Sequence, residues 1–130
     1  MEAIEAALAL GESERAAELV STIDAVPPGL RPPYLTAQAD RFRALLAGAD
    51  ESAAVAFEAA ATGFREIGVV LWQAVTQLQH AEWLVTRGRP ADAAALVAEA
   101  REIFERLEAA PWLDRLRLVD AALDVAGART

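Results

Sequence analysis

The sequence predicts an all-α protein, a right-handed solenoid of antiparallel helical hairpins with about seven helices. One observation is a recurrence of glycine at near-constant spacing of 37, 40 and 39 residues, at Gly11, Gly48, Gly88 and Gly127. Another is an alanine pair that follows each of the first three glycines by five and six residues. A repeat of this length is typical of stacked hairpins, in which one helix ends at the glycine and the next packs back through small residues.

The third observation is the register of the apolar positions. When Gly48 is placed on Gly88, four further pairs coincide: Ala53 with Ala93, Ala60 with Ala100, Phe64 with Phe104 and Ile67 with Leu107. Chance apolar periodicity would not also align the residues that break helices. We therefore interpret the pattern as an internal repeat.

Four helices are predicted in the first half of the chain, over 1–10, 13–26, 33–47 and 50–67. Each carries apolar residues spaced three and four apart, which marks one face of a helix. Gly11 ends the first helix, Ser13 is the N-cap of the second, and Gly68 breaks the fourth. Residues 27–33 hold four prolines and a glycine, which a helix interior does not accommodate, so this segment is interpreted as a spacer rather than a proline-rich ligand.

Three more helices are predicted in the second half: one over 69–87 that ends at Gly88, one that starts at Pro90, and one over 111–126. Proline is favoured in the first turn of a helix, which suits both Pro90 and Pro111. The last helix is predicted to stop at Gly127. Its apolar residues wrap much of its circumference and leave no clean polar side, so we expect either a further hairpin or a second copy to cover it.

Composition narrows the class of protein. The 130 residues suffice for a single domain over 1–130, and a content of 55% hydrophobic residues indicates a folded chain. The net charge of −8 argues against direct binding to nucleic acid, and cysteine is absent, which excludes disulfides and thiolate metal sites. An acidic start and an apolar run too short to cross a bilayer favour a cytoplasmic protein, or a fragment of one.

No catalytic motif is found. The sequence contains no phosphate-binding glycine loop and no nucleophile elbow, and His80 is its single histidine. Glutamates recur every third residue over 99–108 with arginines between them, which we interpret as a solvated face of weak ion pairs. We therefore expect a protein that is not an enzyme and that holds no cofactor or metal.

Two sets of residues resemble the tetratricopeptide repeat, in which a turn glycine precedes a small residue, a bulky one and an alanine. They are Gly48, Ala53, Phe57 and Ala60, and then Gly88, Ala93, Val97 and Ala100. Ala37 and Gln77 stand where that repeat carries a large aromatic residue, and the spacing exceeds the usual period of about 34 residues. The resemblance implies a scaffold that binds proteins.

The segment 81–113 is similar to the C-terminal helical repeats of large bacterial regulators. Those proteins join an ATPase-like domain to a nucleotide cyclase or to a LuxR-type DNA-binding domain. The sequence holds no ATPase, cyclase or DNA-binding segment, so the resemblance implies a separate sensory and assembly module. The expected function is a regulatory, non-catalytic contact with a protein or peptide.

The candidate binding residues lie on the first helix of each hairpin, which lines the concave side of such repeats. They are Gln38, Phe42, Gln79, Glu82, Thr86, Asp114 and Arg117. The carboxylates of Glu82 and Asp114 would hold a basic peptide, with Arg117 fixing its register. The alternative is that these side chains contact the next hairpin.

Two tryptophans eleven residues apart share a face of one predicted helix. Trp72 and Trp83 lie on a strip with Thr76, Gln79 and Thr86, which together form a surface suited to a peptide or a small amphipathic ligand. The other interpretation is that both rings pack between hairpins. A homodimer through the C-terminal helix, or a small-ligand sensor, is the alternative function.

Overall fold

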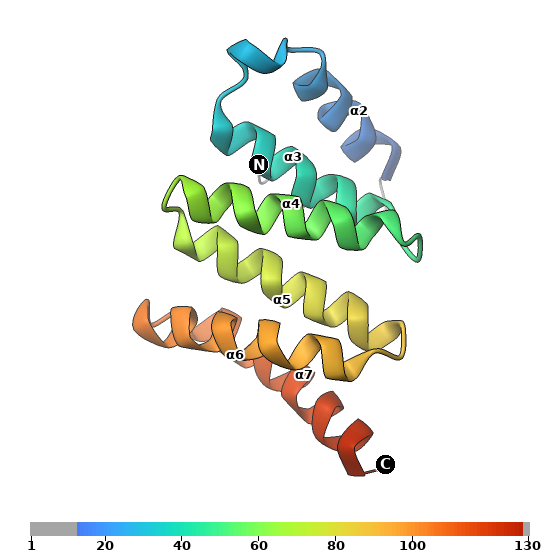
Figure 1. The fold of residues 1–130 in the computed structure, drawn as a ribbon, viewed down its shortest axis with the longest axis vertical. Coiled ribbons are helices and arrows are strands. Elements are labelled where there is room, and N and C mark those ends of the chain that lie inside the picture. The colour runs from blue at the N-terminus through green and yellow to red at the C-terminus, as the bar shows by residue number, and fades with distance from the viewer. Residues whose placement is uncertain (1–12, 129–130) are drawn as a thin grey trace. The chain divides into compact units, whose positions relative to one another are not determined.

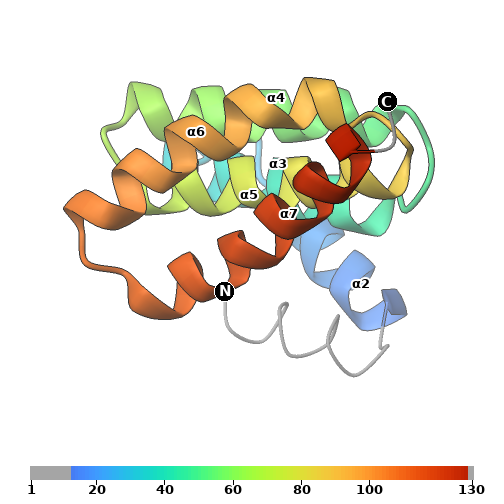
Figure 2. The ribbon, with the colours of Figure 1, turned by 90° about the horizontal axis from the view of Figure 1, so that it is seen from below.

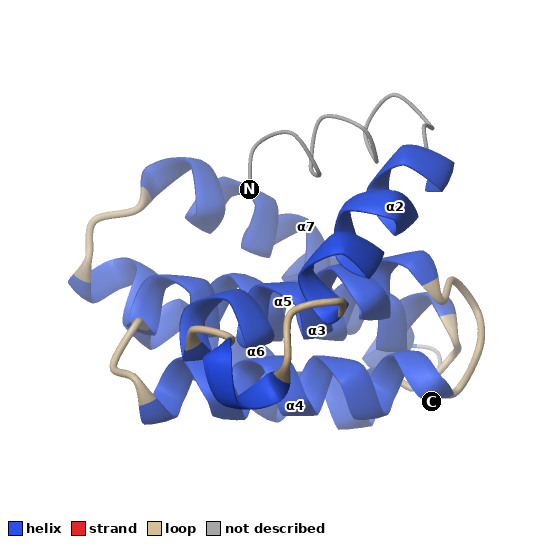
Figure 3. Cartoon of the chain, turned by 90° about the horizontal axis from the view of Figure 1, so that it is seen from above, coloured by secondary structure: helices blue, strands red, loops and turns tan. Residues whose placement is uncertain are grey.

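The computed structural model describes residues 13–128, and every regular element in this range is a helix. The described part of the chain holds six α-helices, one short 3-10 turn and no strand. Their arrangement is drawn in Figures 1 and 3. Their bounds are α2 Ser13–Asp24, η1 Pro28–Leu30, α3 Pro33–Leu46, α4 Ser52–Glu66, α5 Val70–Thr86, α6 Pro90–Arg106 and α7 Ala110–Ala128. The all-α prediction is confirmed.

The predicted helices from residue 13 onward are found with their ends shifted by one or two residues. The helix predicted over 1–10 and the turn at Gly11 lie outside the described residues. One predicted boundary is wrong: α7 continues through Gly127 to Ala128 instead of stopping at the glycine. The proline-rich segment is a connection, as predicted, with η1 inside it.

The chain divides into two compact units, with the boundary between Gly68 and Val69. In the first unit, α2 packs on α3, and α3 forms an antiparallel hairpin with α4 (Figure 1). In the second unit, α5 and α6 form an equivalent hairpin, and α7 crosses it obliquely (Figure 2).

A left-handed residue follows each of four successive helices at intervals of 20 residues. Gly48, Gly68 and Gly88 have φ of 60°, 74° and 72°, and Glu108 takes the fourth position with φ of 53°. After α6, the N–H of Ala109 donates to the carbonyl of Phe104, and the N–H of Glu108 donates to that of Glu105. This is the Schellman arrangement, which satisfies carbonyls that the helix end leaves open.

Glu108→Gly is expected to stabilise the protein by about 1 kcal/mol, because the left-handed conformation costs a side-chain-bearing residue about that much and costs glycine little. Urea unfolding measures the change. Glu105→Gly is the matched control: it places the same glycine inside α6, where it should destabilise by about 1 kcal/mol. A loss of stability in Glu108→Gly would contradict the assignment of the turn.

The first unit owes its close helix packing to small side chains. A β-carbon added at Gly63 on α4 would lie only 3.1 Å from Cβ of Ala37 on α3. Ala53, Ala60 and Phe64 of α4 are completely buried. The ring of Phe64 also meets Tyr34 edge-on at 6.1 Å between centroids.

The second unit is held together by a continuous apolar core. Its buried members come from α5, α6 and α7, and they are Ala74, Val75, Leu78, Ala81, Leu84, Ala93, Val97, Ala100, Ile103, Phe104, Leu116 and Val119. Trp112 at the start of α7 stacks on Phe104 with ring centroids 6.1 Å apart. Two ion pairs fasten α7 at the edges of this core: Arg115 pairs with Glu82 of α5, and Asp120 pairs with Arg101 of α6.

Candidate functional site

Three of the residues predicted to face a partner are completely buried instead. Gln38 and Phe42 on α3 and Thr76 on α5 have no exposed surface. The amide of Gln38 donates to the hydroxyl of Tyr34 and accepts from Nε of Arg41, at 3.0 and 2.9 Å. The hydroxyl of Thr76 donates to the carbonyl of Trp72 at 2.7 Å. In this structure these three side chains are interior groups and do not form a binding surface.

The strip of tryptophans on α5 also lies largely inward. Trp72 and Trp83 are half-buried and pack against the core of the second unit. Gln79, which lies between the two tryptophans in the sequence, is buried. Thr86 is exposed, and its hydroxyl donates a hydrogen bond to the carbonyl of Trp83. Every residue from Gln73 to Ala81 is buried, so the middle of α5 has no solvent face.

The predicted site, in which the carboxylates of Glu82 and Asp114 hold a basic peptide, is not formed either. Glu82 receives both Nε and Nη2 of Arg115, at 2.8 and 2.5 Å, and this bidentate pair joins α5 to α7. Asp114 and Arg117 are exposed and pair with each other at 2.6 Å, one turn apart on α7. Glu82 therefore stabilises the second unit, and only Asp114 and Arg117 remain on the surface.

The structure contains a groove that the sequence did not indicate. It has a volume of about 660 Å³ and lies in the first unit, along one face of the hairpin of α3 and α4. We name it the α3–α4 groove. Its walls are Arg31, Pro33, Thr36, Ala37 and Asp40 from the α3 side, and Val55, Glu58, Ala59, Thr62, Gly63, Glu66 and Ile67 from α4 and its end.

The groove exists because the residues at its centre are small. Ala37, Ala59 and Gly63 lie there, and the residues 40 positions later in the second hairpin are Gln77, Glu99 and Ile103. In that hairpin the amide of Gln73 donates to Glu99 at 2.8 Å and bridges α5 to α6. The same fold therefore has an open face in the first unit and a bridged face in the second. The size difference between equivalent residues of the two hairpins, 40 positions apart in the sequence, is the signal that could have located the groove.

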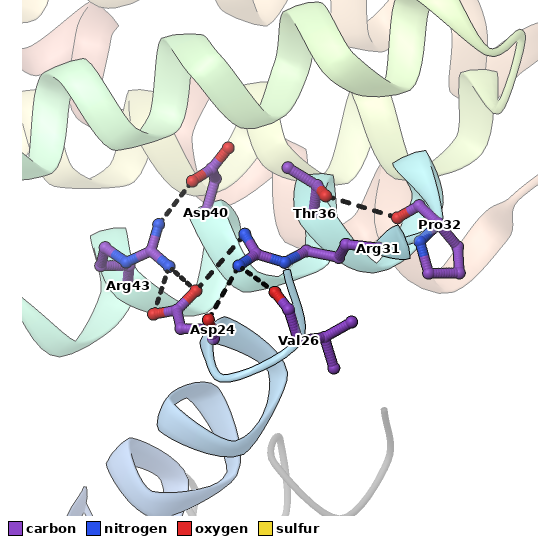
Figure 4. Close-up of polar contacts among 7 residues, drawn as sticks. All are labelled: Asp24, Val26, Arg31, Pro32, Thr36, Asp40 and Arg43. Carbon is purple, nitrogen blue, oxygen red and sulfur yellow. Dashed lines mark hydrogen bonds and ion pairs between the residues drawn. The ribbon is translucent and has the colours of Figure 1, made fainter. Parts of the chain in front are cut away.

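Arg31 and Asp40, which line the groove, belong to an arginine–aspartate network that also includes Asp24 and Arg43 (Figure 4). Arg43 reaches both Asp24, at 2.6 and 2.8 Å, and Asp40, at 2.6 Å. Arg31 donates to the carbonyls of Asp24 and Val26, each at 3.0 Å. These contacts join the end of α2, the proline-rich connection and α3.

Asp40 is the most perturbed carboxyl in this network. Its burial raises its pKa above the ordinary value of 3.8, and the attraction and hydrogen bond of Arg43 offset only part of that rise. Asp24 raises it further by like-charge repulsion, and Arg31 lowers it. Nε of Arg31 is buried and finds no acceptor among the described residues.

The raised pKa of Asp40 predicts a specific pH dependence of stability. The folded protein holds the Asp40 proton more tightly than the unfolded chain, so the contribution of this group falls as pH rises from about 3.8 through the folded pKa. Asp40→Asn should remove that slope while keeping an oxygen for Arg43. Urea unfolding of wild type and variant between about pH 3.5 and 7 checks this.

Asp50 supplies the opposite control. The backbone N–H of Ser52 donates to its carboxylate at 2.8 Å and lowers its pKa below 3.8. Its stabilising contribution is therefore present above pH 3.8 and is lost as pH falls through the folded value, and Asp50→Asn should remove a slope of the other sign. Equal slopes from the two variants would contradict both assignments.

The chemistry that the groove offers is binding. Val55 and Ile67 expose 69% and 37% of their surface there, and Glu58 and Glu66 are exposed along the same helix. The described residues contain no cluster of metal-ligating side chains, and none of their helices has the length and apolarity needed to cross a membrane. Apolar surface beside carboxylates can hold a segment of another molecule.

Comparisons of the chain with known protein families, with curated proteins and with solved structures found no match.

Proposed function

We propose that this protein is a non-catalytic scaffold of the tetratricopeptide type, which binds a segment of a partner protein as a cytoplasmic module of bacterial signalling or transcriptional regulation. The α3–α4 groove is the observation that carries the proposal. It is open, it exposes apolar side chains, and two of its lining residues, Arg31 and Asp40, belong to a network of ion pairs. The repetition of the hairpin after 40 residues and the resemblance to regulator repeats support the same function.

Selection from a displayed library of helical peptides, each roughly five turns long, tests this function. Selected peptides should shift the backbone amide signals of α3 and α4 in NMR spectra of the protein. Ala59→Leu fills the groove from an exposed position and should abolish their binding, whereas Ala98→Leu adds the same side chain to an exposed site on α6 and should not. Failure to select any peptide, or shifts confined to other helices, would refute the proposal.

Self-association through α7 is the second candidate function. Leu118 and Val125 lie seven residues apart, two turns along one side of α7, and expose 72% and 52% of their surface. Apolar residues at this spacing form the seam between paired helices. Light scattering over a wide concentration range should then show a dimer that Leu118→Glu dissociates. A wild-type protein that stays monomeric at every concentration would exclude it.

A further inference from the structure

Of the charged side chains that line the α3–α4 groove, two already bind other groups of the protein and two are exposed to a ligand. Its one lining cation, Arg31, is 14% exposed and directs its Nη groups at Asp24 and at backbone carbonyls. Asp40 is engaged by Arg43. Glu58 and Glu66, in contrast, are exposed, and they line the groove eight residues apart on α4. Eight residues of helix span about 12 Å, so the two carboxylates stand two turns apart on the same side.

The floor between these carboxylates suits the close approach of another backbone. Ala37, Ala59 and Gly63 present almost no side chain there, and Val55 and Ile67 lie at its two ends. Helices approach one another closely where small residues meet, and a helix that enters a groove between two others buries a stripe of its own apolar residues. A helix fits this floor, and two long flexible side chains on one side of that helix, two turns apart, would each reach a glutamate.

Resting on the proposed function, we propose that the α3–α4 groove receives a basic amphipathic helix of a partner protein, whose arginine or lysine side chains pair with Glu58 and Glu66. Its apolar stripe, rich in small residues, lies over Ala59 and Gly63. The two basic residues are seven or eight positions apart, because that interval matches the spacing of the glutamates.

Charge favours this occupant over others. The protein has a net charge of −8, so a second copy brings like charge to an acidic groove, and nucleic acid or an anionic membrane is repelled. A basic helix is attracted both by the whole protein and by the two exposed glutamates. Its association is expected to weaken as salt screens these charges.

The peptide library described above identifies the charge of the occupant. Clones that bind the wild-type groove should be enriched in basic residues seven or eight positions apart. Glu58→Gln with Glu66→Gln should weaken their binding by about two- to twentyfold, as expected for the loss of two solvent-exposed ion pairs. Glu105→Gln, an exposed glutamate on α6, is the matched control and should leave binding unchanged.

The outcomes separate the two levels of the proposal. Neutral or acidic peptides that bind the groove, or basic ones that are indifferent to the double substitution, overturn the basic helix while the scaffold function stands. A library that yields no groove-binding peptide overturns both. Circular dichroism confirms that each variant is folded, and all of these substitutions lie at exposed positions, so loss of fold does not obscure the result.

Discussion

Phe104→Ala is expected to lower the free energy of unfolding of the second unit by about 3–5 kcal/mol. Phe104 has no exposed surface, lies in the core that α5, α6 and α7 share, and stacks on Trp112. Its truncation removes apolar burial, leaves a cavity and takes away the ring against which α7 begins. The loss should appear in urea unfolding followed by circular dichroism and by tryptophan fluorescence.

Leu118→Ala is the control for Phe104→Ala, because it also truncates a large apolar residue but at a position that is 72% exposed. It should change stability by no more than about 0.5 kcal/mol in a monomer. A loss below about 1 kcal/mol in Phe104→Ala would show that α7 does not depend on this stack.

Gly63→Val is the second substitution with a large expected effect, a destabilisation of about 1–3 kcal/mol. The first carbon of the new side chain would lie 3.1 Å from Cβ of Ala37, which is tighter than van der Waals contact, and the β-branch leaves it no rotation away from α3. Ala37 must therefore shift by a few tenths of an ångström, which strains the packing of α3 on α4, and the lining of the α3–α4 groove changes at the same time. Urea unfolding and peptide binding report the two consequences.

A double-mutant cycle isolates the contact between Gly63 and Ala37. Ala37→Gly removes the atom that the valine would strike, so it should cost less in the Gly63→Val background than in wild type, with a coupling of about 0.5 kcal/mol or more. Val55→Ala, at an exposed position on the same helix, should show no coupling to Gly63→Val. Strict additivity of Gly63→Val and Ala37→Gly would mean that α3 and α4 do not meet at these residues.

The helices themselves were predictable because their signals are local. Apolar spacing of three and four residues and the glycines at 48, 68 and 88 place the C-terminal ends of α3, α4 and α5 within one residue of those observed. The identity of a residue misled at Gly127, which lies inside α7 without ending it. At Glu108 the left-handed turn forms without glycine, and hydrogen bonds at the end of α6 accompany it.

The binding residues were less predictable, because the sequence does not show whether a polar residue on a helix is buried or exposed. Gln38 and Thr76 find hydrogen-bond partners on their own helices, and Glu82 finds Arg115, 33 residues away. Hydrogen bonding lets such groups enter the interior at little cost. The predicted partner surface had assumed that first helices keep a solvent face, and the continuous burial of Gln73 to Ala81 removes that face from α5.

By itself the sequence determined the helical class, the position of each described helix and the repetition of a hairpin after 40 residues, since all of these follow from periodicity and turn residues along one stretch of chain. Only the tertiary structure decided which surface is open. The α3–α4 groove is lined by Ala37, Ala59 and Gly63 from two helices, whereas larger residues stand at the equivalent positions of the other hairpin. Whether facing side chains fill or leave the space between two helices is a property of their packing, and no single segment contains it.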